Sequence, residues 1–199
     1  MTAFVLFQQR PDWQAVFWFS FVAWFAIEMW IAARDRRGAS GERRDRGSRL
    51  VIYVFVWTAI AIAFAAPYRV PAARMAFPNA PVFWTAIVLM WAGTVLRTWA
   101  VVTLGRFFRS TVHIHDDHKL VTSGPYRVLR HPGYTGGLMT TTGIGLAQGN
   151  SISLAAAFFL LLVAYVWRIV VEEAALRARF GEAFEAYRRK TWAIIPPVW

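Results

Sequence analysis

The sequence predicts an all-α integral membrane protein with about five transmembrane helices and a cytoplasmic C-terminal helix. Of its 199 residues, 57% are hydrophobic and 11 are Trp, which is more apolar and richer in Trp than soluble domains are. Apolar runs that approach or reach the length of a bilayer crossing alternate with polar loops. These runs are residues 13–33, 50–66, 82–104, 133–149 and 152–171.

The charge distribution predicts the orientation of the chain. A net charge of +11 is compatible with nucleic-acid binding, but such domains carry their charge on a soluble fold with a readable motif, and neither is present. Arg is abundant in residues 34–49 and sparse in the next loop, which holds only Arg69 and Arg74. Because basic loops stay on the cytoplasmic side, the N-terminus is expected outside and the C-terminus inside. The absence of cysteine excludes disulfides, thiolate metal sites and a cysteine nucleophile.

Two charged residues fall inside predicted spans. Glu28 lies in the first span and Arg97 in the third, and such residues are costly unless they meet a partner, a cavity or the interface. For Glu28, the position near the helix end favours reaching the interface. For Arg97, three alternatives stay open, namely snorkelling to the interface, pairing with Glu28, or lining a cavity.

The remaining helices are delimited by turn-forming residues. Pro67, Pro71, Pro78 and Pro81 are expected to end the second span at residue 66. The fourth span is rich in Gly and Thr, which permits close packing against neighbouring helices. A tight uncharged turn at residues 148–151 predicts that the fourth and fifth spans form a helical hairpin.

A polar helix is expected to continue from the fifth span on the cytoplasmic side. Leu176, Phe180, Phe184 and Tyr187 recur at three- and four-residue steps, so they share one face of a helix. Pro196-Pro197 is expected to end this helix.

Residues 118–134, which read HKLVTSGPYRVLRHPGY, are the most informative stretch. Gly124-Pro125 signals a turn, and Pro132 biases His131 away from helical backbone. Irregular backbone at a membrane surface must be buried in protein or line a wet cavity. The segment is therefore a candidate small-molecule site, and the alternative is a turned connector whose basic residues meet lipid headgroups.

A cluster of histidines and acids, HIHDDH at residues 113–118, raises the question of a metal site. On a strand, His113 and His115 would point to the same side. A closed site needs three or four ligands with supporting partners, and short polar clusters are commonly solvated loops. We therefore assign no metal ligand.

The pair Glu172-Glu173 directly follows the fifth span, and Arg168 lies four residues before Glu172. This spacing places Arg168 and Glu172 on one helix face, which by itself favours a simple ion pair. The functional alternative is a cation site beside an anion site. The carboxylate would then hold an ammonium or a sulfonium, and the guanidinium would hold a carboxylate through two hydrogen bonds.

Taken in order, these pieces resemble the isoprenylcysteine carboxyl methyltransferase family, part of a wider group of integral-membrane methyltransferases that includes phospholipid N-methyltransferases. The resemblance rests on HKLVTSGPYRVLRHPGY, the Gly-rich hairpin and EEAALRARFGEAFEAYRRKT, and covers roughly residues 104–197. We expect one membrane domain over residues 1–199, with three spans lacking a motif in 1–104 and a methyltransferase-like core in 105–199. Two departures are Gly133, where the family often has a polar residue, and Phe184, where a Tyr is frequent.

The resemblance implies S-adenosylmethionine as cofactor, bound by an ordered loop region on the cytoplasmic side. It implies Arg168 and Glu172 as catalytic residues, with Glu172 also holding the cofactor. The other implied cofactor contacts are His113 or His115 upstream, then His118, Lys119, Leu120, Val121, Tyr126, His131, Pro132, Gly133 and Tyr134.

The acceptor implied is a lipid-like or prenylated molecule that enters from the bilayer. A carboxylate acceptor needs no general base, whereas an amine or thiol must lose a proton. The alternatives are a phospholipid N-methyltransferase or thiol S-methyltransferase of the same fold, and a small transporter or a scaffold without catalysis. A transporter requires a polar path through the membrane, and the polar residues here gather on one side.

Overall fold

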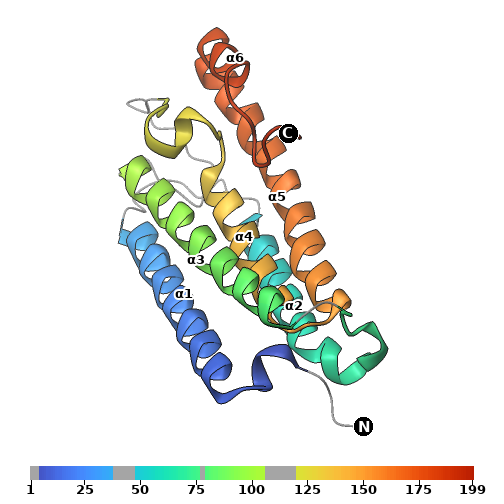
Figure 1. The fold of residues 1–199 in the computed structure, drawn as a ribbon. Helices are drawn as coiled ribbons and strands as arrows, with labels where there is room; N and C mark the ends of the chain where they lie inside the picture. Colours follow the sequence, from blue (N-terminus) through green and yellow to red (C-terminus); the bar gives the residue numbers. More distant parts are fainter. Residues whose placement is uncertain (1–4, 38–47, 77–78, 106–119) are drawn as a thin grey trace.

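The computed structural model describes residues 5–37, 48–76, 79–105 and 120–199, and its regular elements are all helices (Figure 1). The helices are α1 (Pro11–Arg37), α2 (Ser48–Arg69), α3 (Asn79–Leu104), α4 (Pro132–Leu146), α5 (Ser151–Phe180) and α6 (Glu182–Arg188). Short 3-10 turns are η1 (Leu6–Gln8), η2 (Pro71–Ala73) and η4 (Gly124–Arg127). The predicted all-α fold is confirmed.

Four helices, α1, α2, α3 and α5, are long and apolar enough to cross a membrane. The fourth predicted span exists as α4, but it has only 15 residues. At about 1.5 Å per residue it is about 22 Å long, less than the roughly 30 Å of a bilayer core. The chain is thus a multi-pass membrane protein in which α4 packs between α3 and α5.

The α3–α4 contact is a close approach of two backbones. A Cβ atom on Gly136 would lie 2.5 Å from the Gly93 carbonyl oxygen and 2.7 Å from the Arg97 nitrogen. A Cβ on Gly143 would lie 2.6 Å from the Ala86 oxygen. Any side chain at these points would separate the helices, so the expected close packing of the Gly-rich span is confirmed.

Helix α2 continues past Pro67, which corrects the predicted end at residue 66. It runs to Arg69, and the Val70 N–H still donates to the Ala66 oxygen at 2.8 Å. Pro67 has no N–H to offer the carbonyl of Ala63. The Ser153 hydroxyl of α5 donates to that carbonyl instead, at 2.7 Å, and such replacement lets a membrane helix tolerate proline.

The predicted hairpin of the fourth and fifth spans is confirmed, since α4 and α5 are joined by a short turn and pack together. The fifth span also continues beyond the predicted membrane segment, to Phe180. The C-terminal helix is not one continuous element, however. The helix is interrupted at Gly181, where φ is +52°. Glycine adopts this backbone conformation without steric cost.

Helix α6 ends at Arg188, well before Pro196-Pro197, so the prediction that these prolines end the helix is wrong. Beyond α6 the chain turns back, and Leu129 and Trp192 form a parallel bridge. Phe184 is fully buried, as the predicted apolar face requires.

Candidate active site

The segment before α4 is ordered and irregular in its described part, residues 120–134. Gly124 has a φ of +58° and begins the turn η4, and Pro125 follows as its second residue. His131 has a non-helical φ of −127°, and Pro132 begins α4. The turn chemistry read from the sequence therefore produces the predicted irregular structure, with Tyr126 and His131 buried in it.

The first cluster joins α4 to the end of α5. The Tyr134 hydroxyl donates to Glu172 Oε1 at 2.6 Å, and Arg168 Nε donates to the same oxygen at 2.7 Å. Arg168 is 1% exposed, while 20% of the Glu172 side-chain surface is accessible. Glu172 is therefore the more accessible member of a charge pair whose arginine is inside the protein.

His131 lies between the two adjacent glutamates. Its Nδ1 is 3.6 Å from Glu172 Oε2, and its Nε2 is 3.3 Å from Glu173 Oε1. The His131 ring is stacked against Tyr134 with centroids 5.8 Å apart, and Tyr134 in turn stacks on Tyr165 at 4.8 Å. The imidazole is thus within hydrogen-bond distance of Glu173 through Nε2, lies near Glu172 on its other nitrogen, and is stacked on one face.

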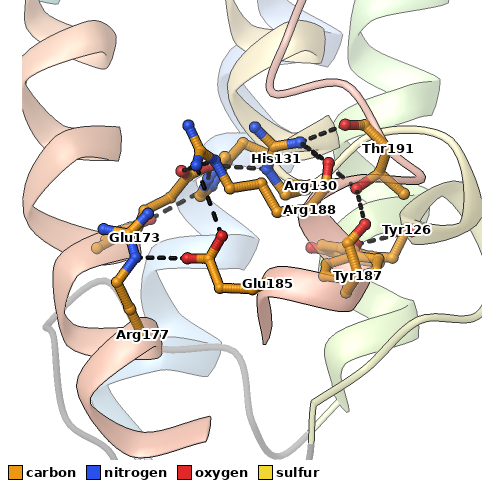
Figure 2. A network of polar contacts seen from close by, with 10 residues as sticks. Tyr126, Arg130, His131, Glu173, Arg177, Glu185, Tyr187, Arg188 and Thr191 are labelled. Atoms are coloured by element: carbon orange, nitrogen blue, oxygen red, sulfur yellow. Dashed lines mark hydrogen bonds and ion pairs between the residues drawn. The ribbon is translucent and has the colours of Figure 1, made fainter. Parts of the chain in front are cut away.

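A second cluster lies on the other side of His131 (Figure 2). Arg130 Nε donates to Glu173 Oε1 at 2.8 Å, and its Nη1 donates to the Arg188 oxygen at 3.2 Å and to the Thr191 oxygen. Arg130 and Glu173 were not predicted site residues. The sequence signal that could have identified them is their position next to His131 and Glu172. Adjacent residues on a helix point about 100° apart, so Glu172 and Glu173 of α5 can bind different partners.

Two tyrosines, the buried Tyr126 and the half-buried Tyr187, lie between this second cluster and α3. The Tyr187 hydroxyl donates to the Tyr126 oxygen at 2.7 Å. The Tyr126 hydroxyl is 3.5 Å from the Ala100 oxygen of α3. Burial raises the pKa of Tyr187 to about 12 and also raises the pKa of Tyr126, so both remain neutral donors.

Glu28 and Arg97 form an ion pair. Of the three alternatives for Arg97, the structure therefore supports pairing with Glu28. Arg97 Nη2 donates to Glu28 Oε2 at 3.0 Å, and its Nε binds Glu28 Oε1. The expectation that Glu28 simply reaches the interface is therefore wrong. Arg97 Nη1 also donates to the Gly133 oxygen at 3.1 Å, so this pair supports the first turn of α4.

Of the predicted site residues, the structure brings together His131, Tyr134, Arg168 and Glu172. Pro132 and Gly133 form the first turn of α4 between them. Leu120 and Val121 are half-buried residues in the coil before η4, and Tyr126 faces α3 through its hydroxyl. His113, His115, His118 and Lys119, with the HIHDDH cluster, lie outside the described residues.

Comparison with known proteins places these residues in a family context. A probable protein-S-isoprenylcysteine O-methyltransferase of Oryza sativa is 38% identical over 126 residues, which cover 60% of this chain and 66% of the rice protein. The corresponding enzyme of Schizosaccharomyces pombe is 35% identical over 56% of this chain and 48% of its own length. The chain therefore spans about half to two thirds of these curated relatives.

A solved structure is similar as well. It is that of the eukaryotic intramembrane Ras methyltransferase, isoprenylcysteine carboxyl methyltransferase, with a TM-score of 0.59 and 26% identity over 73% of this chain and 52% of the other. The sequence profile of the phospholipid methyltransferase family matches residues 81–183. This range contains His131, Tyr134, Arg168 and Glu172 of the first cluster and Arg130 and Glu173 of the second, and methyl transfer implies a methyl donor. Because the match covers more than half of the 199 residues, the chain belongs to the phospholipid methyltransferase family.

Proposed function

We propose that this protein is an integral-membrane methyltransferase that transfers a methyl group from S-adenosylmethionine to the carboxylate of a prenylated, lipid-like acceptor. The observation that carries the proposal is the buried Arg168 paired with the more accessible Glu172 at the polar end of α5. This pair lies within a family match to methyltransferases. The similarity to isoprenylcysteine O-methyltransferases supports the acceptor class.

The donor is expected to meet Glu172, His131 and Tyr134. S-adenosylmethionine carries a sulfonium and an ammonium, and a carboxylate is complementary to either cation. Glu172 already binds two donors through Oε1, which holds the carboxylate in one orientation. Family resemblance adds Tyr126, Pro132 and Gly133 as proposed contacts. It also adds Leu120, Val121, His118, Lys119 and His113 or His115 upstream.

The acceptor carboxylate is expected to meet Arg168. A guanidinium binds a carboxylate through two parallel hydrogen bonds, and burial keeps the site free of competing water. In the reaction a carboxylate oxygen forms a bond to the methyl carbon while the carbon–sulfur bond breaks. The electron pair of the broken carbon–sulfur bond remains on sulfur, so the sulfonium becomes a neutral thioether. No proton is transferred, and the protein contributes alignment and desolvation.

The test is methyl transfer from labelled S-adenosylmethionine to prenylcysteines, aminophospholipids and small thiols. Label on a prenylcysteine as a base-labile ester supports the proposal. Label on an aminophospholipid would instead support the alternative, a phospholipid N-methyltransferase of the same fold. Failure of the purified protein to bind S-adenosylmethionine in both detergent and lipid, measured by calorimetry, would exclude both.

The proposed orientation has the N-terminus outside and the C-terminus and active site in the cytoplasm, as the arginine distribution predicts. Asn79 begins α3 at one end of the bundle, and Lys190 follows α6 at the other (Figure 1). Impermeant thiol labelling of intact cells should therefore reach Asn79→Cys and miss Lys190→Cys. The opposite pattern would reverse the orientation.

A further inference from the structure

The Arg130 guanidinium connects three elements that are distant in the sequence. Arg130 is 8% exposed, and its Nε donates to Glu173 of α5 at 2.8 Å. Its Nη1 donates to the backbone oxygens of Arg188 and Thr191, at the end of α6 and just beyond it. The last carbonyls of a helix lack partners within the helix, and Arg130 supplies one.

The backbone around Arg130 holds the returning C-terminal segment. The Arg130 N–H donates to the Trp192 oxygen at 2.7 Å, and the Trp192 N–H donates to the Val128 oxygen at 2.9 Å. The His131 N–H donates to the Ala193 oxygen at 3.0 Å. The position of His131 therefore depends on the C-terminal segment as well as on α4.

Glu173 connects Arg130 to His131. Its Oε1 is 2.8 Å from Arg130 Nε and 3.3 Å from His131 Nε2 (Figure 2). The neighbouring Glu172 instead binds Arg168 and Tyr134. The two adjacent carboxylates thus have different partners, and His131 is the side chain that lies between them.

We propose that Arg130 is a positioning residue for the methyl-donor site, acting through Glu173 on His131 and through Thr191 on the C-terminal segment. This inference rests on the proposed function. The planar guanidinium reaches a carboxylate and two carbonyls at once, which the single ammonium of a lysine does not match. Arg130 therefore influences the affinity for the methyl donor without contacting the donor. Arg168, which pairs with Glu172, instead binds the carboxylate of the acceptor.

The test compares Arg130→Lys with the wild type at varied concentrations of S-adenosylmethionine and of a prenylcysteine. We expect the KM for the donor to rise about tenfold, because a charge-assisted hydrogen bond that orients His131 is weakened. The KM for the acceptor and kcat at saturating donor should stay within about twofold. Arg177→Lys is the matched control, since it alters an ion pair with Glu185 in which 46% and 32% of the two side chains are exposed, against 6% and 11% for Arg130 and Glu173.

A purely structural role predicts a different pattern. The apparent kcat would fall with the folded fraction and both KM values would be unchanged, which would overturn the inference. If Arg130→Lys does not fold, Glu173→Gln decides the question, because it keeps the shape and removes the charge. An unchanged donor KM in folded Glu173→Gln would contradict the inference. A wild type that transfers no methyl group would instead contradict the proposed function.

Discussion

The two ends of α5 use polar side chains in opposite ways. At the first end, Asn150 Oδ1 accepts hydrogen bonds from the Ile152 and Ser153 N–H groups at 3.0 and 3.3 Å. Asn150 Nδ2 donates to the Val70 oxygen at 3.0 Å, and the Ser153 hydroxyl donates to Ala63. These neutral side chains bind backbone groups. At the other end, Arg168, Glu172 and Glu173 bind mainly other side chains.

This difference separates structural from chemical roles within one helix. A backbone carbonyl has a fixed position once its helix has formed, and a buried one needs a hydrogen-bond donor. The contacts of Asn150 and Ser153 with α2 and the residue after it therefore serve to hold α2 and α5 together. A carboxylate shared between an arginine, a phenol and an imidazole can exchange one partner for a ligand of similar charge. Chemistry is therefore expected at the charged end alone, and the following variants test that separation.

The largest expected effect is at Arg168. Arg168→Lys retains the charge but loses the planar pair of donors, so kcat with a prenylcysteine should fall about 100-fold, or about 2.7 kcal/mol of transition-state stabilisation. Affinity for S-adenosylmethionine, measured by calorimetry, should change little. Arg168→Ala should lose further activity. Prenylcysteine methylation by Arg168→Lys at the wild-type rate would show that the two-donor carboxylate contact is wrong. The 2.7 Å pair with Glu172 would then be structural.

Much of this architecture follows from local sequence patterns. Apolar runs predicted five membrane helices, of which four are long enough to span and the fourth run forms the shorter α4. Gly124-Pro125 and Pro132 predicted the irregular segment before α4. The spacing of Arg168 and Glu172 predicted their ion pair, because residues four apart share a helix face. Each of these features depends on residues close in the chain.

The missed features depend on residues far apart in the chain. The continuation of α2 past Pro67 needs the Ser153 hydroxyl, 90 residues from its acceptor Ala63. Arg130 meets Thr191, 61 residues away, and backbone pairing with the C-terminal segment leaves no side-chain pattern to read. Gly181 was a visible helix breaker, but the apolar periodicity that continues through it favoured one helix.

An intermediate effect is expected at the neutral end. Asn150→Ala removes the cap of α5 and the bond to Val70, so the free energy of unfolding should fall by about 1–2 kcal/mol. Thermal unfolding in detergent would measure this, with Asn79→Ala as the control that loses one exposed bond to Gln9. Both KM values and kcat per folded enzyme should stay at the wild-type level. A selective change in donor KM would mean that the two ends are coupled.

The smallest effect is expected at Glu185, which lies near the charged end but on its surface. Arg177 Nε donates to Glu185 Oε1 at 2.5 Å, and this hydrogen bond, with the charge of Arg177, lowers the pKa of Glu185. A lowered folded-state pKa adds stability above the usual glutamate range and loses it as the pH falls through the folded pKa. Glu185→Gln should therefore lower Tm by about 1 °C or less at pH 7, because solvent screens an exposed pair. The difference from the wild type should disappear as the pH is lowered through that range. A Tm loss as large as that of Asn150→Ala would show that the Arg177–Glu185 pair contributes substantially to stability. Arg177→Lys would then no longer be a suitable control for Arg130→Lys.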